Sequence, residues 1–175
     1  YGTGPMGLLH VMLAATSGAG RIVAADRNPQ RLALARELGA ADTVNVAERS
    51  VADWARAHAA DGVDVVIIAV PVPEIQAEAM EILAPLGRLC LFAGWPRGTA
   101  GVPLDTNAIH YKSLVVTGTT GGAPRDYVAS LKLIASGRVD VRRVVSHVFA
   151  FDQLAKAYET AGSGQALKVV IAAQP

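Results

Sequence analysis

The chain has 175 residues, of which 51% are hydrophobic, and its formal net charge is +1. This size and composition suit one domain with a single sizeable core. Basic residues are scattered apart from Arg142-Arg143, so the composition gives no sign of a nucleic-acid surface. No apolar run approaches the roughly 18 residues of a membrane helix, and we expect a soluble chain with no membrane partner.

The single cysteine, Cys90, lies in the apolar run from Leu89 to Phe92. A lone thiol forms no disulfide framework, which favours a cytoplasmic location and an inert, buried side chain. The four histidines are too dispersed for a zinc motif, so we expect no metal site in this chain. They are His10, His58, His110 and His147.

Glycines at positions 2, 4 and 7 give the spacing of a dinucleotide-binding loop, and an apolar run with helical spacing follows from Leu8. The first glycine permits a tight turn, the second lets the backbone touch a pyrophosphate, and the third lets helix and strand pack closely. A diphosphate would lie on the free N–H groups of the helix N-terminus, where Pro5 suits the first turn. Small glycine clusters also occur in ordinary turns, so the motif is a hypothesis that its context must support.

Such a loop needs a buried strand immediately before it, and the chain offers only Tyr1. We therefore expect a fragment of a longer polypeptide, in which upstream residues complete the strand. In the doubly wound strand order 3-2-1-4-5-6 the first strand is central, so its loss predicts a gap in the sheet.

A second strand is predicted over residues 21–25, and it ends at Asp26. Asp26 lies 19 positions after Gly7, where a carboxylate accepts hydrogen bonds from the adenosine ribose and repels the 2′-phosphate of NADP. NAD is therefore the expected cofactor, although the adjacent Arg27 could receive a 2′-phosphate, so NADP stays possible. The alternative is that Asp26 only caps the next helix, a role that Asn28 could also fill.

That helix is predicted from Pro29 to Leu38, with Gly39 ending it and Arg31 projecting toward the adenosine pocket or into solvent. A short strand over residues 43–46 and a helix over 51–60, with Trp54 on its inner side, come next. The continuous apolar run over 63–70 predicts a strand that is buried on both faces, as in a parallel sheet covered by helices.

Pro71 and Pro73 end that strand, and Ile75, Ala79, Ile82 and Leu83 predict a helix that ends near residues 85–87. Further strands are predicted over 88–93 and 114–117. The loops that follow them, including Gly94 and Thr119, lie at the ligand edge. A helix over 125–136 is predicted to turn four apolar residues inward. They are Val128, Leu131, Leu133 and Ile134.

The regular alternation of strand and helix predicts an α/β fold, a Rossmann doubly wound parallel sheet of six strands with the first strand truncated. The last forty residues change character, with strands over 144–149 and 166–173 and a helix capped by Asp152 between them. Because the sheet is complete by Thr117, we expect residues 1–140 to form the cofactor domain. Residues 141–175 would return toward a second domain that is mostly absent.

Several of these segments together resemble the medium-chain, zinc-type alcohol dehydrogenases, with the threonine and sorbitol (polyol) dehydrogenases closest. The segments are the glycine loop, Asp26 with the helix that ends at residues 35–40, the stretch 109–112, and the closing run 164–170. The resemblance implies an NAD-binding Rossmann domain and a tail that returns to a catalytic domain. It places the zinc ligands and the proton relay mainly in that catalytic domain, outside this chain.

By the same resemblance, the glycine loop holds the pyrophosphate, Asp26 and Arg31 hold the adenosine ribose, and Lys168 approaches the phosphates from the last strand. The loops around Pro71 and after the strand over 88–93 would line the adenine and nicotinamide clefts. The expected cofactor-binding residues are Gly2, Gly4, Pro5, Met6, Gly7, Asp26, Arg27, Arg31, Val70, Pro71, Phe92, Ala93, Gly94, Thr119 and Lys168. No catalytic residue is expected within the chain.

The function that this resemblance implies is hydride transfer between a secondary alcohol and NAD, with zinc in the catalytic domain. We expect the isolated chain to bind NAD weakly and to have no activity alone. Two alternatives stay open, a zinc-free oxidoreductase like the quinone reductases and an NAD(H)-binding module without catalysis. The implied partners are a small alcohol or polyol substrate and further copies of the chain, as a dimer or tetramer.

Overall fold

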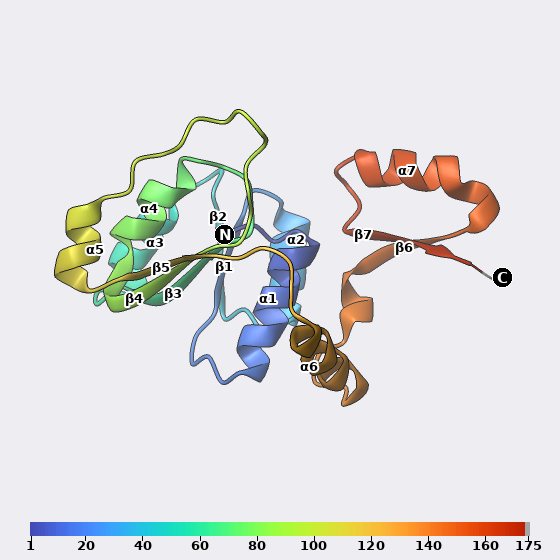
Figure 1. Cartoon of the computed structure of the whole chain (residues 1–175), viewed down its shortest axis with the longest axis horizontal. Helices are drawn as coiled ribbons and strands as arrows, with labels where there is room; N and C mark the ends of the chain where they lie inside the picture. Colours follow the sequence, from blue (N-terminus) through green and yellow to red (C-terminus); the bar gives the residue numbers. More distant parts are fainter. Residues whose placement is uncertain (174–175) are drawn as a thin grey trace.

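The computed structural model describes residues 1–173, an α/β arrangement of parallel strands with connecting helices (Figure 1). The elements in chain order are α1 (Pro5–Thr16), β1 (Val23–Asp26), α2 (Pro29–Glu37), β2 (Asp42–Asn45), α3 (Val51–His58), β3 (Val63–Ile68), α4 (Ile75–Glu81), β4 (Leu83–Leu91), α5 (Thr106–Lys112), β5 (Val115–Gly118), α6 (Pro124–Ala135), the 3₁₀ helix η1 (Val141–Val144), β6 (Val145–Ala150), the 3₁₀ helix η2 (Phe151–Gln153), α7 (Leu154–Gly162) and β7 (Lys168–Ala172). Among these residues no helix has the length and hydropathy that crossing a membrane demands.

Strands β1 and β2 pair in parallel, as do β3, β4 and β5, and Tyr1 joins the two groups. The main-chain nitrogen of Tyr1 donates to the Ile67 carbonyl at 2.8 Å, and the Tyr1 carbonyl accepts from the Ala69 N–H at 2.8 Å. On the other side, the Gly2 N–H donates to the Ala25 carbonyl at 2.8 Å. The order β2-β1-Tyr1-β3-β4-β5 is the doubly wound order with its first strand reduced to one residue. The predicted Rossmann architecture is therefore confirmed.

Away from Tyr1, β1 and β3 separate around a cavity of about 440 Å³. The cavity is lined by β1, by α1 and by the edge of β3 that does not pair with β4, and the lining residues include Val23, Val11 and Val65. The cavity also reaches Tyr1, Gly2 and Ala69. We call this opening the seam.

The main core lies between the β3-β4 pair and helices α3 and α4. Leu89 and Val44 are completely buried there, and Trp54 is 2% exposed on the inner side of α3, as predicted. A second core forms where α1 packs on β1 and α2, around Leu8 and Ala35, which are also completely buried. Helices therefore cover both faces of the sheet and fix the ends of its strands.

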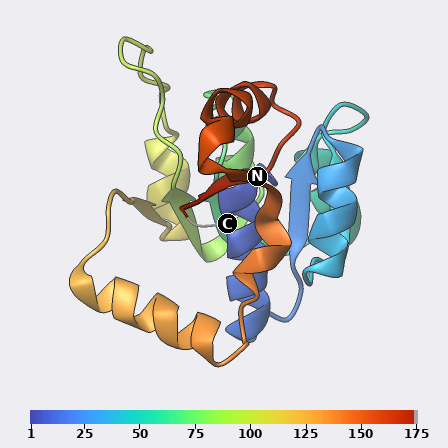
Figure 2. The same ribbon diagram turned by 90° about the vertical axis from the view of Figure 1, so that its right-hand side faces the viewer.

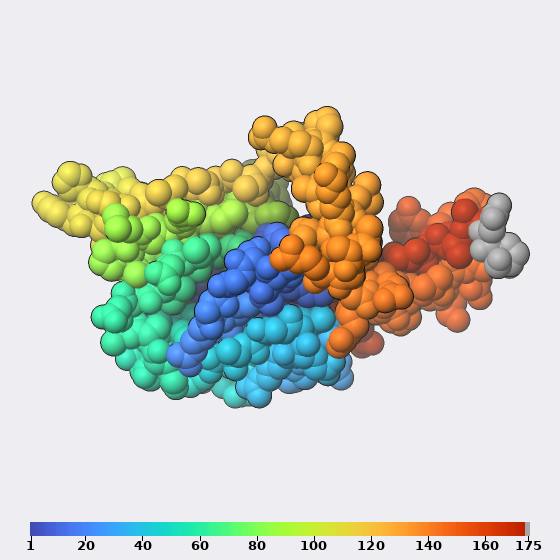
Figure 3. Space-filling model, turned by 90° about the horizontal axis from the view of Figure 1, so that it is seen from below, coloured from blue at the N-terminus to red at the C-terminus, as the bar shows by residue number. Residues whose placement is uncertain are grey.

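The last elements form a separate substructure, which we call the C-terminal unit (residues 141–172). Strands β6 and β7 pair in parallel, with α7 as the crossover between them. The unit projects beyond the main sheet (Figures 1 and 3). Val144 of η1 and the preceding Val139 are buried against Leu8 and Val11 of α1, so the unit is docked on the α1 side of the sheet.

The helix predicted to include Leu83 ends earlier, because Leu83 belongs to β4 and lies opposite Val63 in the β3-β4 pair. The backbone of Leu86 takes a left-handed conformation with φ +64°, where the register of the pair shifts. An apolar run such as residues 79–84 suits either a helix face or a buried strand, and pairing with β3 decides between them.

Helix α6 also departs from the prediction, because most of its apolar face is exposed. Figure 2 shows the helix standing away from the sheet. Val128 is 52% exposed and Leu131 is 65% exposed, whereas Leu133 packs against the second core. Ile134 is 39% exposed. The prediction that Asp152 caps the following helix is wrong as well, since Gln153 occupies the N-cap position of α7.

Candidate cofactor site

The three glycines of the opening loop differ in the space around them. A Cβ atom on Gly2, whose φ is +87°, would lie 2.8 Å from the Val70 Cβ, and one on Gly7 would lie 1.7 Å from the Gly2 carbonyl oxygen. A Cβ on Gly4 would have no atom within 4 Å. The first and third glycines therefore allow close packing of the loop, and the second leaves an open space that a side chain would fill. This is the division of roles that a diphosphate-binding loop requires.

Helix α1 begins at this open space. Gly4 is its N-cap and Pro5 its first residue, no side chain caps it, and its first turn contains no acidic residue. The 12-residue helix thus offers unsatisfied N–H groups and the positive end of its dipole. Met6, in this first turn, is 48% exposed. The arrangement suits a bound anion and would accept the pyrophosphate of a dinucleotide.

Asp26 lies at the end of β1, beside the loop. Its Oδ2 accepts the Thr3 N–H at 2.6 Å, and its Oδ1 accepts the Asn28 N–H at 2.9 Å. Burial alone would raise the pKa of Asp26, but these two hydrogen bonds and the charge of Arg31 outweigh it and lower the pKa below its ordinary value. Asp26 is therefore a carboxylate at neutral pH, with lone pairs left to accept ribose hydroxyls.

The cap of α2 is Asn28, whose Oδ1 accepts the N–H groups of Gln30 at 2.9 Å and Arg31 at 3.1 Å. The interpretation of Asp26 as the helix cap is therefore excluded, and its carboxylate faces the glycine loop. Arg27 is exposed and Arg31 is half-buried, with its guanidinium Nη2 donating to the Gly164 carbonyl at 2.7 Å.

The other expected residues follow the carboxyl ends of neighbouring parallel strands. Val70 and Pro71 follow β3, the stretch 92–94 follows β4, and Thr119 follows β5. The loops are linked by backbone hydrogen bonds, because the Ala93 N–H donates to Ile68 at 2.9 Å and the Thr119 N–H donates to Leu91 at 3.4 Å. They therefore form one edge of the sheet, with Val70 against Gly2.

Phe92 reaches α1 from this edge, and its ring meets the His10 ring edge to face with centroids 4.5 Å apart. Lys168 lies elsewhere, as the exposed first residue of β7 in the C-terminal unit. In the described part of the chain its side chain forms no hydrogen bond with the glycine loop. The structure thus gathers the expected residues at one edge, with Lys168 set apart on the C-terminal unit.

Comparison with known proteins identifies the family to which the chain belongs. The model of the family described as zinc-binding dehydrogenase matches residues 5–136. The chain belongs to this zinc-binding dehydrogenase family. It is 30% identical over 171 residues to the L-threonine 3-dehydrogenase of Pseudoalteromonas atlantica, across 97% of this chain and 49% of that protein. The L-threonine 3-dehydrogenase of Burkholderia vietnamiensis is 31% identical over the same shares of the two chains.

Solved structures of this family have the same fold. An alcohol dehydrogenase zinc-binding domain protein from Burkholderia ambifaria superposes with a TM-score of 0.88 and 29% identity, over 98% of this chain and 46% of that one. An alcohol dehydrogenase from Thermotoga maritima superposes with a TM-score of 0.89 and 26% identity, over 97% and 48% of the two chains. The chain therefore spans about half the length of the relatives that it matches.

The described residues of this family member do not suit a zinc ion. Within residues 1–173, no group of three or more His, Cys, Asp or Glu side chains lies close enough together to hold a metal. The single thiol, Cys90, lies inside β4, between β3 and β5. A zinc site needs three or four such ligands, so no catalytic step can be assigned to zinc from these residues.

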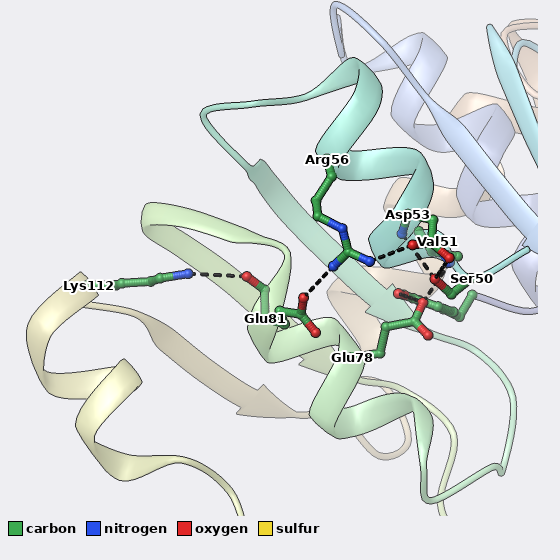
Figure 4. A network of polar contacts seen from close by, with 8 residues as sticks. Ser50, Val51, Asp53, Arg56, Glu78, Glu81 and Lys112 are labelled. Atoms are coloured by element: carbon green, nitrogen blue, oxygen red, sulfur yellow. Dashed lines mark hydrogen bonds and ion pairs between the residues drawn. The ribbon is translucent and has the colours of Figure 1, made fainter.

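The Glu78 carboxylate belongs to a polar network of this dehydrogenase chain, which Figure 4 shows with Val51, Ser50, Asp53 and Arg56. The Tyr1 hydroxyl donates to Glu78 Oε1 at 2.9 Å, and the Val51 N–H donates to the same oxygen at 2.8 Å. Burial and then the Glu78 carboxylate raise the pKa of the Tyr1 phenol. Because Tyr1 immediately precedes Gly2, this network helps to hold the start of the glycine loop.

Two contributors to the site carry no recognisable sequence signal. The Thr3 N–H and the Gly164 carbonyl act through backbone atoms, which every residue type offers. His10 has a weak signal, since it lies three residues after Gly7, about one helical turn along α1.

Proposed function

We propose that this chain is the NAD-binding part of a zinc-dependent dehydrogenase that oxidises a secondary alcohol or polyol. The observation that carries the proposal is the open space at Gly4, which lies between the uncapped N-terminus of α1 and the loop held by Asp26. Membership of the zinc-binding dehydrogenase family supports the same conclusion.

In this proposal the chain binds and orients the cofactor. The backbone of the glycine loop and the first turn of α1 hold the pyrophosphate. The Asp26 carboxylate accepts the hydroxyls of the adenosine ribose and repels a 2′-phosphate, so NAD binds in preference to NADP. When bound, NAD accepts the hydride from the alcohol carbon.

The edge residues form the rest of the cofactor cleft in this proposal. Val70 and Pro71 border the adenine side, Phe92, Ala93 and Gly94 border the nicotinamide, and the Thr119 hydroxyl offers a hydrogen bond. Lys168 would pair with the phosphates from the C-terminal unit, which lies beside α2 through the contact between Arg31 and Gly164.

The proposed organisation assigns residues 1–140 to cofactor binding and residues 141–175 to a segment that reaches the catalytic domain. Relatives about twice as long as this chain support the presence of that domain in the working enzyme. Zinc would be held there and would polarise the alcohol as a Lewis acid. Metal analysis of the full-length enzyme tests this assignment, and an active enzyme without zinc would favour the quinone-reductase alternative.

Titration calorimetry with NAD and with NADP tests the cofactor assignment. Asp26→Asn is expected to weaken NAD binding by about tenfold or more and to narrow the difference between the two cofactors, because a charged acceptor is lost. Asp152→Asn, at an exposed position far along the chain, is the matched control and should bind as wild type does. Equal NAD affinity in Asp26→Asn and wild type would refute the ribose assignment.

The chain alone is expected to turn over no alcohol. An assay with threonine, polyols and simple alcohols checks this, and measurable turnover would contradict the proposal that the catalytic groups lie in another domain.

We also propose that copies of the chain associate through the edge of β5, where Val115 is 48% exposed. Light scattering of Val115→Lys against wild type tests that contact, since a charge on an edge strand opposes pairing.

A further inference from the structure

Helix α2 links the proposed adenosine site to the C-terminal unit. At its first turn, the Arg31 Nη2 donates to the Gly164 carbonyl at 2.7 Å. At its last turn, Glu37 accepts the Arg143 guanidinium at 2.6 Å. Asp26, which would bind the ribose, lies three residues before this helix. The C-terminal unit is therefore attached to the same helix that begins beside the cofactor edge.

Hydrogen bonds fix Arg31 both at its main chain and at its guanidinium. Its backbone N–H is fixed by the Asn28 cap, and its guanidinium Nη2 is fixed by Gly164. Between these points the buried Nε has no hydrogen-bond partner among residues 1–173. A buried donor without a partner is costly in a folded protein, so this atom is available to an acceptor that binds nearby.

The direction of the Gly164 carbonyl depends on backbone conformation. Gly164 has φ +73°, the left-handed region that glycine and asparagine enter readily and β-branched residues avoid. A Cβ on Gly164 would have no atom within 4 Å, so the Cβ itself meets no steric obstacle and the strain of a substitution comes from the backbone conformation. A β-branched residue at this position is therefore expected to change the direction of the carbonyl.

We propose that Gly164 is a positioning residue for the adenosine end of the cofactor site: its carbonyl holds the Arg31 guanidinium beside Asp26, with Nε left to donate to the ribose. This inference rests on the proposed NAD function. The hydrogen bond between Arg31 and Gly164 also favours NAD over NADP, because turning the guanidinium toward a 2′-phosphate would break that bond. Gly164 thereby takes part in cofactor binding without touching the cofactor.

A ligand-free measurement tests the positioning directly. The Arg31 Nε–H signal, assigned by its loss in Arg31→Lys, should exchange slowly with solvent in wild type. Exchange should be at least tenfold faster in Gly164→Val, which disfavours the left-handed backbone. The conservative Gly164→Asn should restore slow exchange. If the Arg31 Nε–H of Gly164→Val exchanged with solvent as slowly as that of wild type, the inference would be overturned.

Calorimetry with NAD and NADP tests the consequence for binding. Gly164→Val should weaken NAD binding by about tenfold, the value expected for a hydrogen bond to a charged group. In the Arg31→Lys background, Gly164→Val should not weaken NAD binding any further, because Gly164 acts through Arg31. An added loss in the double variant would show that Gly164 acts elsewhere and would overturn the inference.

The two proposals fail in different ways. If the wild-type chain binds neither nucleotide, the proposed function fails, and the exchange of the Arg31 Nε–H still decides whether Gly164 holds the guanidinium. If wild type binds NAD and Gly164→Val binds it equally well, the proposed function stands and the positioning role is refuted.

Discussion

Two alanine substitutions in the glycine loop should separate stability from binding. Gly7→Ala should lower the free energy of unfolding, whereas Gly4→Ala should weaken NAD binding and leave the free energy of unfolding almost unchanged. In Gly7→Ala, the new Cβ would lie 1.7 Å from the Gly2 carbonyl oxygen, where ordinary contact begins at 3.4 Å. The loop or α1 must move, at a cost of about 3 kcal/mol or more. For a domain of this size that corresponds to a melting temperature lower by about 6–12 °C.

In Gly4→Ala, the new Cβ would meet no atom within 4 Å, and the backbone φ of −63° suits alanine. The free energy of unfolding should therefore stay within about 1 kcal/mol of wild type. The same methyl group occupies the space where the pyrophosphate would approach, so NAD affinity should fall by at least about tenfold.

Calorimetric unfolding and NAD titration of both variants separate these effects. Gly4→Ala should melt as wild type does and fail to bind, whereas Gly7→Ala should already be destabilised without ligand. A Gly4→Ala chain with wild-type NAD affinity would refute the assignment of the open space to a diphosphate. A Gly7→Ala chain as stable as wild type would refute the steric reasoning.

Three further predictions concern stability. Lys112→Met removes two hydrogen bonds to the Glu81 and Leu83 carbonyls, where α4 leads into β4, and should cost about 1 kcal/mol in urea unfolding. Lys132→Met, exposed on α6, should cost almost nothing. The lowered pKa of Asp26 means that this carboxylate stabilises the fold above its unfolded pKa of about 3.9, and that the contribution is lost as pH falls through the folded pKa. Wild type should therefore lose more stability below about pH 5 than Asp26→Asn does, in unfolding measured across pH. Leu89→Ala, at a completely buried position, should cost about 2–5 kcal/mol, whereas Leu131→Ala, at a position that is 65% exposed, should stay within about 0.5 kcal/mol.

Each of these stability predictions has an outcome that contradicts it. Equal losses in Lys112→Met and Lys132→Met would show that the α4 carbonyls are satisfied in another way. Parallel pH profiles for wild type and Asp26→Asn would mean that the carboxylate has its ordinary pKa in the folded state. A large loss in Leu131→Ala would show that the α6 face is covered in solution.

The sequence predicted the features that depend on local chemistry. Glycine spacing placed the loop before α1, and the apolar run over residues 63–70 predicted the strand β3. The prediction that this strand is buried on both faces was wrong for its first half, since Val65 is 52% exposed. The break at Pro71 and the Asn28 cap were also readable, because proline and asparagine restrict the backbone in known ways. The expected edge loops after β3, β4 and β5 consequently lie at the carboxyl ends of the strands, where parallel topology puts them.

The features that the sequence did not predict depend on distant contacts. Leu83 belongs to β4 because it pairs with Val63, which no local pattern encodes. The short helix α5 is the exception, since its cap is local: the Asp105 side chain accepts the Ala108 N–H at 3.0 Å, and the prediction missed this signal. The outward face of α6 depends on what lies against it, and the Gly164 carbonyl acts through an atom that all residues share. Apart from the cap of α5, each of these features depends on residues that are far apart in the sequence.

The hydrogen bonds of Tyr1 and Gly2 have a consequence for communication across the sheet. Gly2 bonds to β1 and Tyr1 bonds to β3, so the main chain at the start of the glycine loop is coupled to both strands at once. A displacement of either strand would therefore be transmitted to the loop without passing through any side chain.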